Sequence, residues 1–234
     1  MQGYRISGIW SRDITHAAAL AACCDSVVCD DISLLKDGAD FIIIAVPDKA
    51  IEIVAGSLGW FDGTVVHTAG SVSVEVLKAY FRNYGSFYPL QTFSKAIPVS
   101  LDDVPFFLEA STDEVLHSIK SVASALSSKV YEADSSTRLL LHAAAVFAGN
   151  YSNLMYVIGN ELLNHANLPV EVLYPLIKET ARKATNGDPL LTQTGPARRK
   201  DTPTLEKHIE ALASFPEYAE LYRLLANIII SKYK

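Results

Sequence analysis

The feature that most constrains this chain is the stretch Leu139–Leu163, 25 residues without proline and rich in Leu, Ala, Val and Met. Residues of these types are good helix formers, and apolar side chains on nearly every face of a helix indicate that the helix is buried. We therefore expect one long helix inside a core, with the rest of the chain packed around it.

A polar stripe interrupts the apolar surface of this helix. At about 100° per residue, several polar side chains fall close to one line, with Gly149 on the same line and Asn150 at its edge. These side chains are Arg138, His142, Asn153, Tyr156 and Asn160. Because buried polar groups need hydrogen-bond partners, the stripe is either a bonded seam between helices or subunits, or the wall of an active-site cleft.

Strands and helices alternate in the part of the chain that precedes this helix. Phe41–Val46 (FIIIAV) is a continuous apolar run closed by Pro47. Such a run is typical of a strand buried on both faces of a parallel sheet, and we expect it to be central. The other expected strands are Tyr4–Trp10, Val27–Val28, Thr64–His67, Gly85–Phe87, Phe106–Glu109 and Lys129–Glu132. The intervening helices are expected at Ile14–Ala22, Lys49–Leu58, Val72–Phe81 and Asp113–Ser127.

This alternation predicts an α/β domain with a mostly parallel sheet over residues 1–133. From Ser135 onward no strand is expected. Helices at Val170–Thr185, Pro203–Ala213 and Pro216–Tyr233 follow the long one, and they predict an all-α domain over residues 134–234.

Composition excludes several classes of protein. The net charge of −6 argues against binding to nucleic acid or an anionic membrane surface. The His and Asn residues of the long helix argue against a membrane span, and Met1–Trp10 lacks the apolar region of a signal peptide. Cys23, Cys24 and Cys29 lack partners at metal-ligand spacing, so we expect reduced thiols, no metal and a cytoplasmic protein.

Ligands of open α/β sheets bind outside the carboxyl ends of the strands. Those ends carry Ser11-Arg12, Val46-Pro47-Asp48, His67–Ser71 and Tyr88-Pro89. Arg12 follows the first expected strand, where an NADP protein has its 2′-phosphate-binding Arg, although a solvated surface Arg is the alternative. A G-x-G-x-x-G turn, which would hold a pyrophosphate on backbone N–H groups, does not occur in the sequence.

Five segments together carry a resemblance that spans about residues 4–215. They are FIIIAVPDKAI (Phe41–Ile51), HTAGS (His67–Ser71), GSFYPLQTFSK (Gly85–Lys95), RLLLHAAAVFAGNYSNLMY (Arg138–Tyr156) and QTGPARRKD (Gln193–Asp201). In these segments the chain resembles a Rossmann-like family with an all-α C-terminal domain of unassigned function. Members of that family are provisionally classed as NADP oxidoreductases. The family is related to pyrroline-5-carboxylate reductase and to 6-phosphogluconate and ketopantoate dehydrogenases.

The resemblance implies a Rossmann-like domain followed by a helical domain like that of 6-phosphogluconate dehydrogenase. The first strand and glycine-rich turn of such a domain are absent, as though about 20–30 residues preceded Met1. This departure predicts that NADP binds weakly or not at all. Some relatives carry a Lys on the long helix where this sequence has His142, so no catalytic Lys is assigned.

Two readings of function stay open. In the first, an oxidoreductase transfers a hydride between NADP and a small acidic carbonyl, imine, hydroxy-acid or amino-acid-like substrate. His142 then gives a proton, while Asn150 and Asn153 orient the substrate. The cofactor residues are Ser11, Arg12, Val46, Pro47, His67, Thr68, Ala69 and Gly70. The substrate residues are Ser71, Tyr88, Pro89 and Arg198.

In the second reading, the protein keeps the fold without catalysis and serves in ligand binding or assembly. The basic turn at Arg198, whose side chain clamps an acidic substrate group in the first reading, is then a solvated surface. Both readings include a small-molecule ligand. The apolar surface of the long helix exceeds what about 100 helical residues readily cover, so both also include a homodimer through the helical domain.

Overall fold

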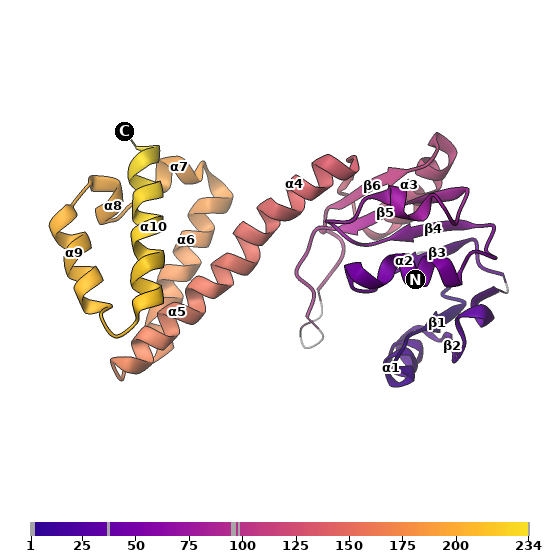
Figure 1. Ribbon diagram of the computed structural model, residues 1–234, viewed down its shortest axis with the longest axis horizontal. Helices are drawn as coiled ribbons and strands as arrows, with labels where there is room; N and C mark the ends of the chain where they lie inside the picture. The colour runs from indigo at the N-terminus through magenta and orange to yellow at the C-terminus, as the bar shows by residue number, and fades with distance from the viewer. Residues whose placement is uncertain (1–2, 37, 95–96, 98, 234) are drawn as a thin grey trace. The chain divides into compact units, whose positions relative to one another are not determined.

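The computed structural model describes residues 3–36, 38–94, 97 and 99–233. Lys95, at the end of the Gly85–Lys95 motif, lies outside the described residues. The chain divides into two compact units, Met1–Tyr151 and Ser152–Lys234, whose elements are labelled in Figure 1. The strands end before the expected domain boundary at residue 133, whereas the division between the units falls later, inside the long helical stretch.

The strands of the first unit form a two-stranded and a five-stranded sheet among the described residues. Their bounds are β1 (Gly8–Trp10), β2 (Val27–Cys29), β3 (Phe41–Ile44), β4 (Thr64–His67), β5 (Asn83–Pro89), β6 (Phe106–Ala110) and β7 (Val130–Glu132). The larger sheet has the order β3-β4-β5-β6-β7, with β5 and β6 antiparallel and the other pairs parallel. The mostly parallel α/β architecture and the Rossmann-like fold class are thereby confirmed.

One expectation about the sheet is wrong. Phe41–Val46 was expected to be a central strand, but β3, which covers Phe41–Ile44, is the outermost strand of the five-stranded sheet, and Ile43 is 50% exposed. In the dinucleotide-binding strand order 3-2-1-4-5-6, the first strand lies between the second and the fourth. β1, β2 and β3 correspond to the second, third and fourth strands of that order, so the break between the two sheets falls at the position of the first.

The helices of the first unit are α1 (Ile14–Cys24), α2 (Ile51–Ser57), α3 (Asp113–Leu126) and α4 (Ser135–Ala145), with short 3-10 turns at Ile32–Lys36, Asp48–Ala50 and Val74–Leu77. α1 packs against the two-stranded sheet, whereas α2 and α3 cover opposite faces of the larger sheet. The turn at Val74–Leu77 replaces the helix expected over Val72–Phe81. Val65 packs in a core with α2, while its neighbour Val66 packs in a second core with α3. Because successive strand residues point to opposite faces, the two cores lie on opposite sides of the sheet.

The long helix exists, but in the single chain it is not buried. α4 continues through a π-helical segment, η4 (Val146–Tyr151), into α5 (Ser152–His165). From Leu139 to Leu163 every residue is partly or fully exposed, including Leu140 at 73% and Phe147 at 70%. The expectation of a buried central helix is therefore wrong for one chain alone.

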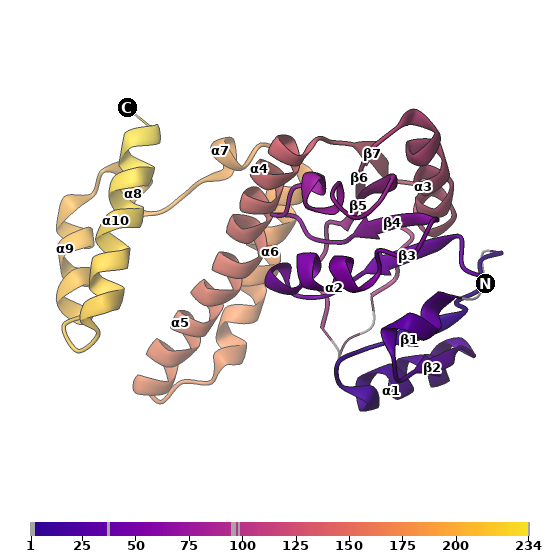
Figure 2. The ribbon, with the colours of Figure 1, turned by 45° about the vertical axis from the view of Figure 1, so that its right-hand side comes forward.

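The second unit is entirely helical within its described residues. After α5 come a 3-10 turn (Val170–Leu173), α6 (Tyr174–Asn186), α7 (Pro189–Thr192), α8 (Pro196–Arg199), α9 (Thr202–Ala211) and α10 (Pro216–Lys232). Figure 2 shows α8 and α9 beside α10, where Ala197, Leu205 and Ala226 form a small core. No helix in the described part of the chain is both long and apolar enough to cross a membrane.

Candidate functional site

On one face of the five-stranded sheet, the side chains of β3 are apolar, and polar side chains lie near the ends of β4 and β5. His67 of β4 pairs with Ser86 of β5, and Ser86 pairs with Glu109 of β6. Paired residues of neighbouring strands point to the same face, and so do residues two apart, which adds Tyr88. Ile44 of β3 pairs with His67, so it points to the same face of the sheet. Ile44 packs in the core that contains residues of α2, and α2 therefore covers the apolar part of this face. A row of polar side chains thus crosses the sheet near the carboxyl ends of β4 and β5.

His67 is a neutral, structural part of this row. Its side chain is fully buried, and burial lowers its pKa to about 4, with the positive charge of Arg138 acting in the same direction. Nδ1 accepts a hydrogen bond from the Ala69 N–H at 3.2 Å, which places the ring proton on Nε2. Among the described residues, Nε2 of His67 has no hydrogen-bond partner, and neither has the buried Oγ of Ser86.

The first turns of α4 are fixed to the polar row by a buried ion pair. The Asp134 side chain caps the helix by accepting from the Thr137 N–H at 2.7 Å. Arg138 is fully buried and donates from Nη1 to Oε2 of Glu109 at 2.5 Å. The Ser135 hydroxyl donates to the same carboxylate oxygen at 2.7 Å. The face of α4 that carries Arg138 is therefore the face turned to the sheet.

His142 lies one helical turn after Arg138 on that face, against the end of β5. The Tyr88 hydroxyl is 3.0 Å from His142 Nδ1, and the two rings meet edge to face. Burial raises the pKa of Tyr88, so its hydroxyl remains protonated at neutral pH. The protonated Tyr88 hydroxyl can donate to His142 Nδ1, and the His142 ring is partly exposed. A protonated phenol and an imidazole are thereby placed at the strand ends.

Gly70 allows this contact. A Cβ at Gly70 would lie 2.7 Å from His142 Nδ1 and 2.8 Å from Tyr88 Cζ, closer than real Cβ contacts. Gly70 follows β4 by three residues and is buried. The absent side chain is therefore what lets the strand-end backbone approach the Tyr88–His142 pair. The structure brings together Gly70, Tyr88 and His142, with His67 in the same polar row.

Other residues predicted at the strand ends lie at or near the surface. Ser71 is exposed, and its hydroxyl bonds the Asp48 carboxylate, which links the ends of β4 and β3. Pro47 is exposed, while Val46, Thr68 and Pro89 are partly exposed and Ala69 is buried. Ser11 and Arg12 follow β1 in the separate two-stranded sheet, and Arg12 is exposed. Their predicted roles in binding are not tested by these positions.

The two asparagines of the predicted polar stripe differ from His142. Asn150 and Asn153 are exposed, and Asn153 belongs to the second unit. The π-helical segment Val146–Tyr151 contains Asn150 and departs from the constant helical pitch at which the stripe was extrapolated, because an i→i+5 turn adds about one residue. A stripe extrapolated at constant helical pitch therefore loses its alignment after Ala145. Arg198, also in the second unit, stacks its guanidinium 4.0 Å over the Tyr233 ring.

Ser86 and Glu109 of the polar row were not singled out from the sequence, and neither was Ser135 of α4, whose hydroxyl bonds Glu109. The period-2 pattern of β5 contained the signal for Ser86, but the pairing of Glu109 with it depends on the antiparallel register of β6. No group of three or more His, Cys, Asp or Glu side chains suited to a metal occurs in the described ranges.

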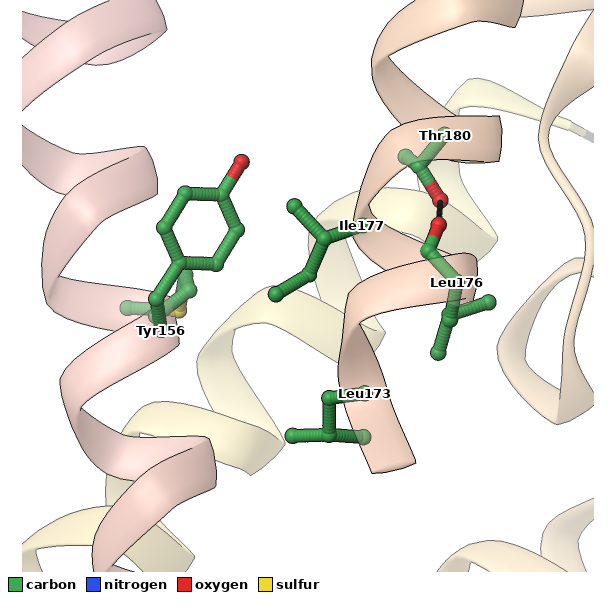
Figure 3. Close-up of a pocket in the computed structure, with 6 residues that line it drawn as sticks. Tyr156, Leu173, Leu176, Ile177 and Thr180 are labelled. Atoms are coloured by element: carbon green, nitrogen blue, oxygen red, sulfur yellow. Dashed lines mark hydrogen bonds between the residues drawn. The ribbon is translucent and has the colours of Figure 1, made fainter. Parts of the chain in front are cut away.

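A separate apolar groove lies in the second unit, between α5 and α6 (Figure 3). It has a volume of about 220 Å³ and is lined by Met155, Tyr156, Leu173, Leu176, Ile177 and Thr180. The Thr180 hydroxyl donates to the Leu176 carbonyl at 2.9 Å, which leaves Tyr156 to supply the remaining polar side-chain atom. The groove is thus suited to apolar contact and not to proton or hydride chemistry.

Comparisons with known proteins agree with this architecture. A model of the family described as a domain of unknown function (DUF2520) matches residues 104–229. The crystal structure of the provisionally named NADP oxidoreductase BF3122 from Bacteroides fragilis is 40% identical, with a TM-score of 0.91 over 98% of this chain and 90% of that one. No curated protein matches at a significant level.

Two more distant structures share the fold. Protein TM1727 from Thermotoga maritima is 24% identical, with a TM-score of 0.74 over 97% of this chain and 90% of that one. A reductive aminase from Aspergillus terreus in complex with NADPH and ethyl-5-oxohexanoate is 16% identical. Its TM-score is 0.72 over 99% of this chain and 87% of that one.

Proposed function

The chain belongs to the family of the domain of unknown function DUF2520, and from this premise we propose that it is an NADP-dependent oxidoreductase acting on a small carbonyl or imine. The observation that carries the proposal is the Tyr88–His142 contact beside Gly70, at the carboxyl ends of the parallel strands. Ligands of this fold class bind at those ends. Reduction of C=O or C=N needs a proton donor there as well as a hydride source.

The residues at the ends of β3 and β4 suit the flat ring of a nicotinamide. Val46, Pro47, Ala69 and Gly70 are small or apolar. The pyrophosphate end fits less well, because the sequence has no G-x-G-x-x-G turn to hold it. When bound, the nicotinamide would supply the hydride.

The chain's own contribution is the proton. Tyr88 keeps its hydroxyl proton at neutral pH, because burial raises its pKa, and it bonds His142 at 3.0 Å. His142 is partly exposed and can exchange protons with solvent. Together they provide a proton that is held beside the sheet and renewed from water.

An activity assay tests this proposal. NADPH at millimolar concentration is incubated with a panel of small keto acids, cyclic imines and ketone–amine pairs, and its loss is followed by absorbance. We expect turnover with at least one acidic carbonyl or imine and a loss of turnover in His142→Ala. No turnover with any member of the panel would favour the second reading.

A non-catalytic role is the second candidate. The observation that favours it is the Tyr88–His142 contact itself, because a phenol and an imidazole can hold a small ligand by hydrogen bonds alone. In that case, the Tyr88–His142 pair would bind a small ligand without transferring a proton. Ligand binding by calorimetry without NADPH consumption would identify this role.

The assembly that we propose is a homodimer through the helical unit. Four apolar residues are buried among its described residues, Ala197, Leu205, Ala219 and Ala226. Large apolar side chains lie exposed on several of its elements, among them Val172 at 54%, Leu176 at 63% and Leu224 at 57%. Exposed apolar surface on this scale usually marks an interface, and self-association through one isologous face is the commonest solution. The groove of Figure 3 contributes Leu176 to this surface.

A further inference from the structure

Arg138 is the largest fully buried side chain in the described part of the chain, and the proposed chemistry gives it no part. It leaves α4 on the same face as His142 and one turn earlier, because residues four apart in a helix share a face. A buried guanidinium is unusual enough to need an explanation, since arginine is rarely buried without a specific role for its charge or its donors.

The guanidinium connects three elements. Nη1 donates to Glu109 of β6 at 2.5 Å, and Nη2 donates to the Val72 carbonyl at 2.7 Å in the segment after β4. Nη2 also approaches the Ser135 hydroxyl at 3.1 Å, and that hydroxyl accepts from the Val74 N–H at 3.2 Å. The start of α4, the segment after β4 and the middle of β6 are therefore fixed relative to one another at one side chain.

Energy alone does not explain this arrangement. Taking two charges out of water carries a large desolvation cost that their attraction only partly offsets, and a well-packed apolar residue often stabilises a fold as much. A planar guanidinium adds direction, because its donors lie in a fixed fork. The fork restricts both the rotation of α4 and its position along the sheet. Because His142 lies one turn later on the same helix, the position of its side chain is restricted as well.

We propose that Arg138 is a positioning residue that holds His142 against Tyr88. The proposal rests on the proposed function, in which that pair supplies the proton. The Tyr88–His142 contact tolerates little movement of α4, since the distance from the Tyr88 hydroxyl to His142 Nδ1 is 3.0 Å and there is no room for a methyl group at Gly70. A rotation of α4 by a fraction of a turn would separate the two side chains. The positive charge of Arg138 also lowers the pKa of Tyr88, against the larger effect of burial.

The test uses the ¹⁵N resonances of the His142 ring in the full chain, which require no substrate. The Tyr88→Phe variant first defines the Nδ1 shift in the absence of the Tyr88 hydrogen bond. In Arg138→Met we expect the Nδ1 resonance to move to the value of Tyr88→Phe. Arg138→Lys, which keeps the charge and loses the fork, should move it part of the way. Arg82→Met, a change at an exposed arginine of the same unit, is the matched control and should leave it unchanged.

The titration of Tyr88 separates charge from position. Arg138→Met should raise the midpoint of Tyr88 ionisation, whereas Arg138→Lys should keep it near the wild-type value. If Arg138→Met fails to fold, Ser135→Ala serves in its place, because it removes one partner of the guanidinium and keeps the arginine. It should shift the Nδ1 resonance in the same direction by a smaller amount.

Two results would overturn the proposal. One is a folded Arg138→Met whose His142 resonances equal those of the wild type, which would make Arg138 a purely structural ion-pair partner. The other is identical His142 resonances in wild type and Tyr88→Phe, which would show that there is no contact to position. Neither result depends on turnover, so failure of the oxidoreductase proposal is recognised separately, by the NADPH assay.

Discussion

The Gly70→Ala substitution is the smallest change that tests the geometry at the strand ends. The added Cβ would lie 2.7 Å from His142 Nδ1, 2.8 Å from His142 Cγ and 2.8 Å from Tyr88 Cζ. An ordinary contact begins at 3.4 Å, so His142 or the whole of α4 must move. Overpacking of this kind costs about 1–3 kcal/mol, and loss of the Tyr88–His142 hydrogen bond adds about 1 kcal/mol. We expect the free energy of unfolding to fall by about 2 kcal/mol or more.

The assay is urea unfolding followed by tryptophan fluorescence. The chain has two tryptophans, Trp10 and Trp60, and both belong to the first unit, so the signal reports the unit that contains Gly70. Gly56→Ala is the matched control. Its Cβ would meet Tyr80 at an ordinary 3.5 Å inside α2, where replacing Gly by Ala stabilises a helix by about 0.5–1 kcal/mol.

A double-mutant cycle tests whether the cost of Gly70→Ala arises from its contact with the His142 ring. In a His142→Ala background, two of the three close contacts of the new methyl group disappear, so Gly70→Ala should cost clearly less than in the wild type. If Gly70→Ala is as stable as the wild type, or costs the same with and without the His142 ring, then the packing of α4 against the strand end is not as described.

The other predictions concern pH, cofactor and assembly. The folded-state pKa of His67 lies near 4, below the unfolded value of 6.5, so the unfolded chain takes up a proton first as the pH falls. As the pH falls from 6.5 to 4, the free energy of unfolding should therefore decrease by up to about 3 kcal/mol. In urea titrations of His67→Asn, this decrease should be absent. A chain of residues 1–234 alone, which has no G-x-G-x-x-G turn, should bind NADPH more weakly than micromolar in a fluorescence titration, because the N–H cradle normally adds charge-assisted hydrogen bonds of roughly 1.5–3 kcal/mol each; micromolar or tighter binding would point to another phosphate site. Light scattering should give the mass of a dimer at micromolar concentration and of a monomer for Leu176→Glu, with Ile53→Glu, a change at a still more exposed apolar residue of α2, leaving the dimer unchanged; a monomeric wild type would contradict the interface.

The fold class followed from local patterns. The apolar run at Phe41 and the amphipathic segment at Asp113 predicted their strand and helix, because burial on each element repeats with its own period. The position of β3 at a sheet edge could not be predicted in this way. A continuous apolar run indicates that a strand is buried, but it does not indicate which strands or helices bury it. The helix expected over Val72–Phe81 shortens to one 3-10 turn, whose Val74 and Leu77 pack in the core before the chain enters β5 at Asn83.

The candidate site could be predicted only in part. Tyr88 and Gly70 followed from the rule that strand ends meet at one edge, and His142 followed from the polar stripe on the helix. Glu109 did not follow, because its place beside Ser86 depends on an antiparallel pairing that the sequence does not specify. Asn150 and Asn153 were placed with His142 at constant helical pitch. The π-helical turn at Val146–Tyr151 interrupts that pitch, and no pattern in the sequence predicts it.

The central claim is that the Tyr88–His142 pair supplies the proton for an NADPH-dependent reduction. The measurement that tests it most directly is kcat for the best substrate of the panel, in wild type, His142→Ala and His117→Ala. His117 is an exposed histidine on α3 and serves as the matched control. We expect His142→Ala to lose at least about 100-fold in kcat, the usual loss when a general acid is removed. His117→Ala should keep the wild-type rate, and both variants should keep the wild-type free energy of unfolding in urea to within about 1 kcal/mol. A folded His142→Ala protein with full activity would contradict the claim and leave His142 a packing residue of α4.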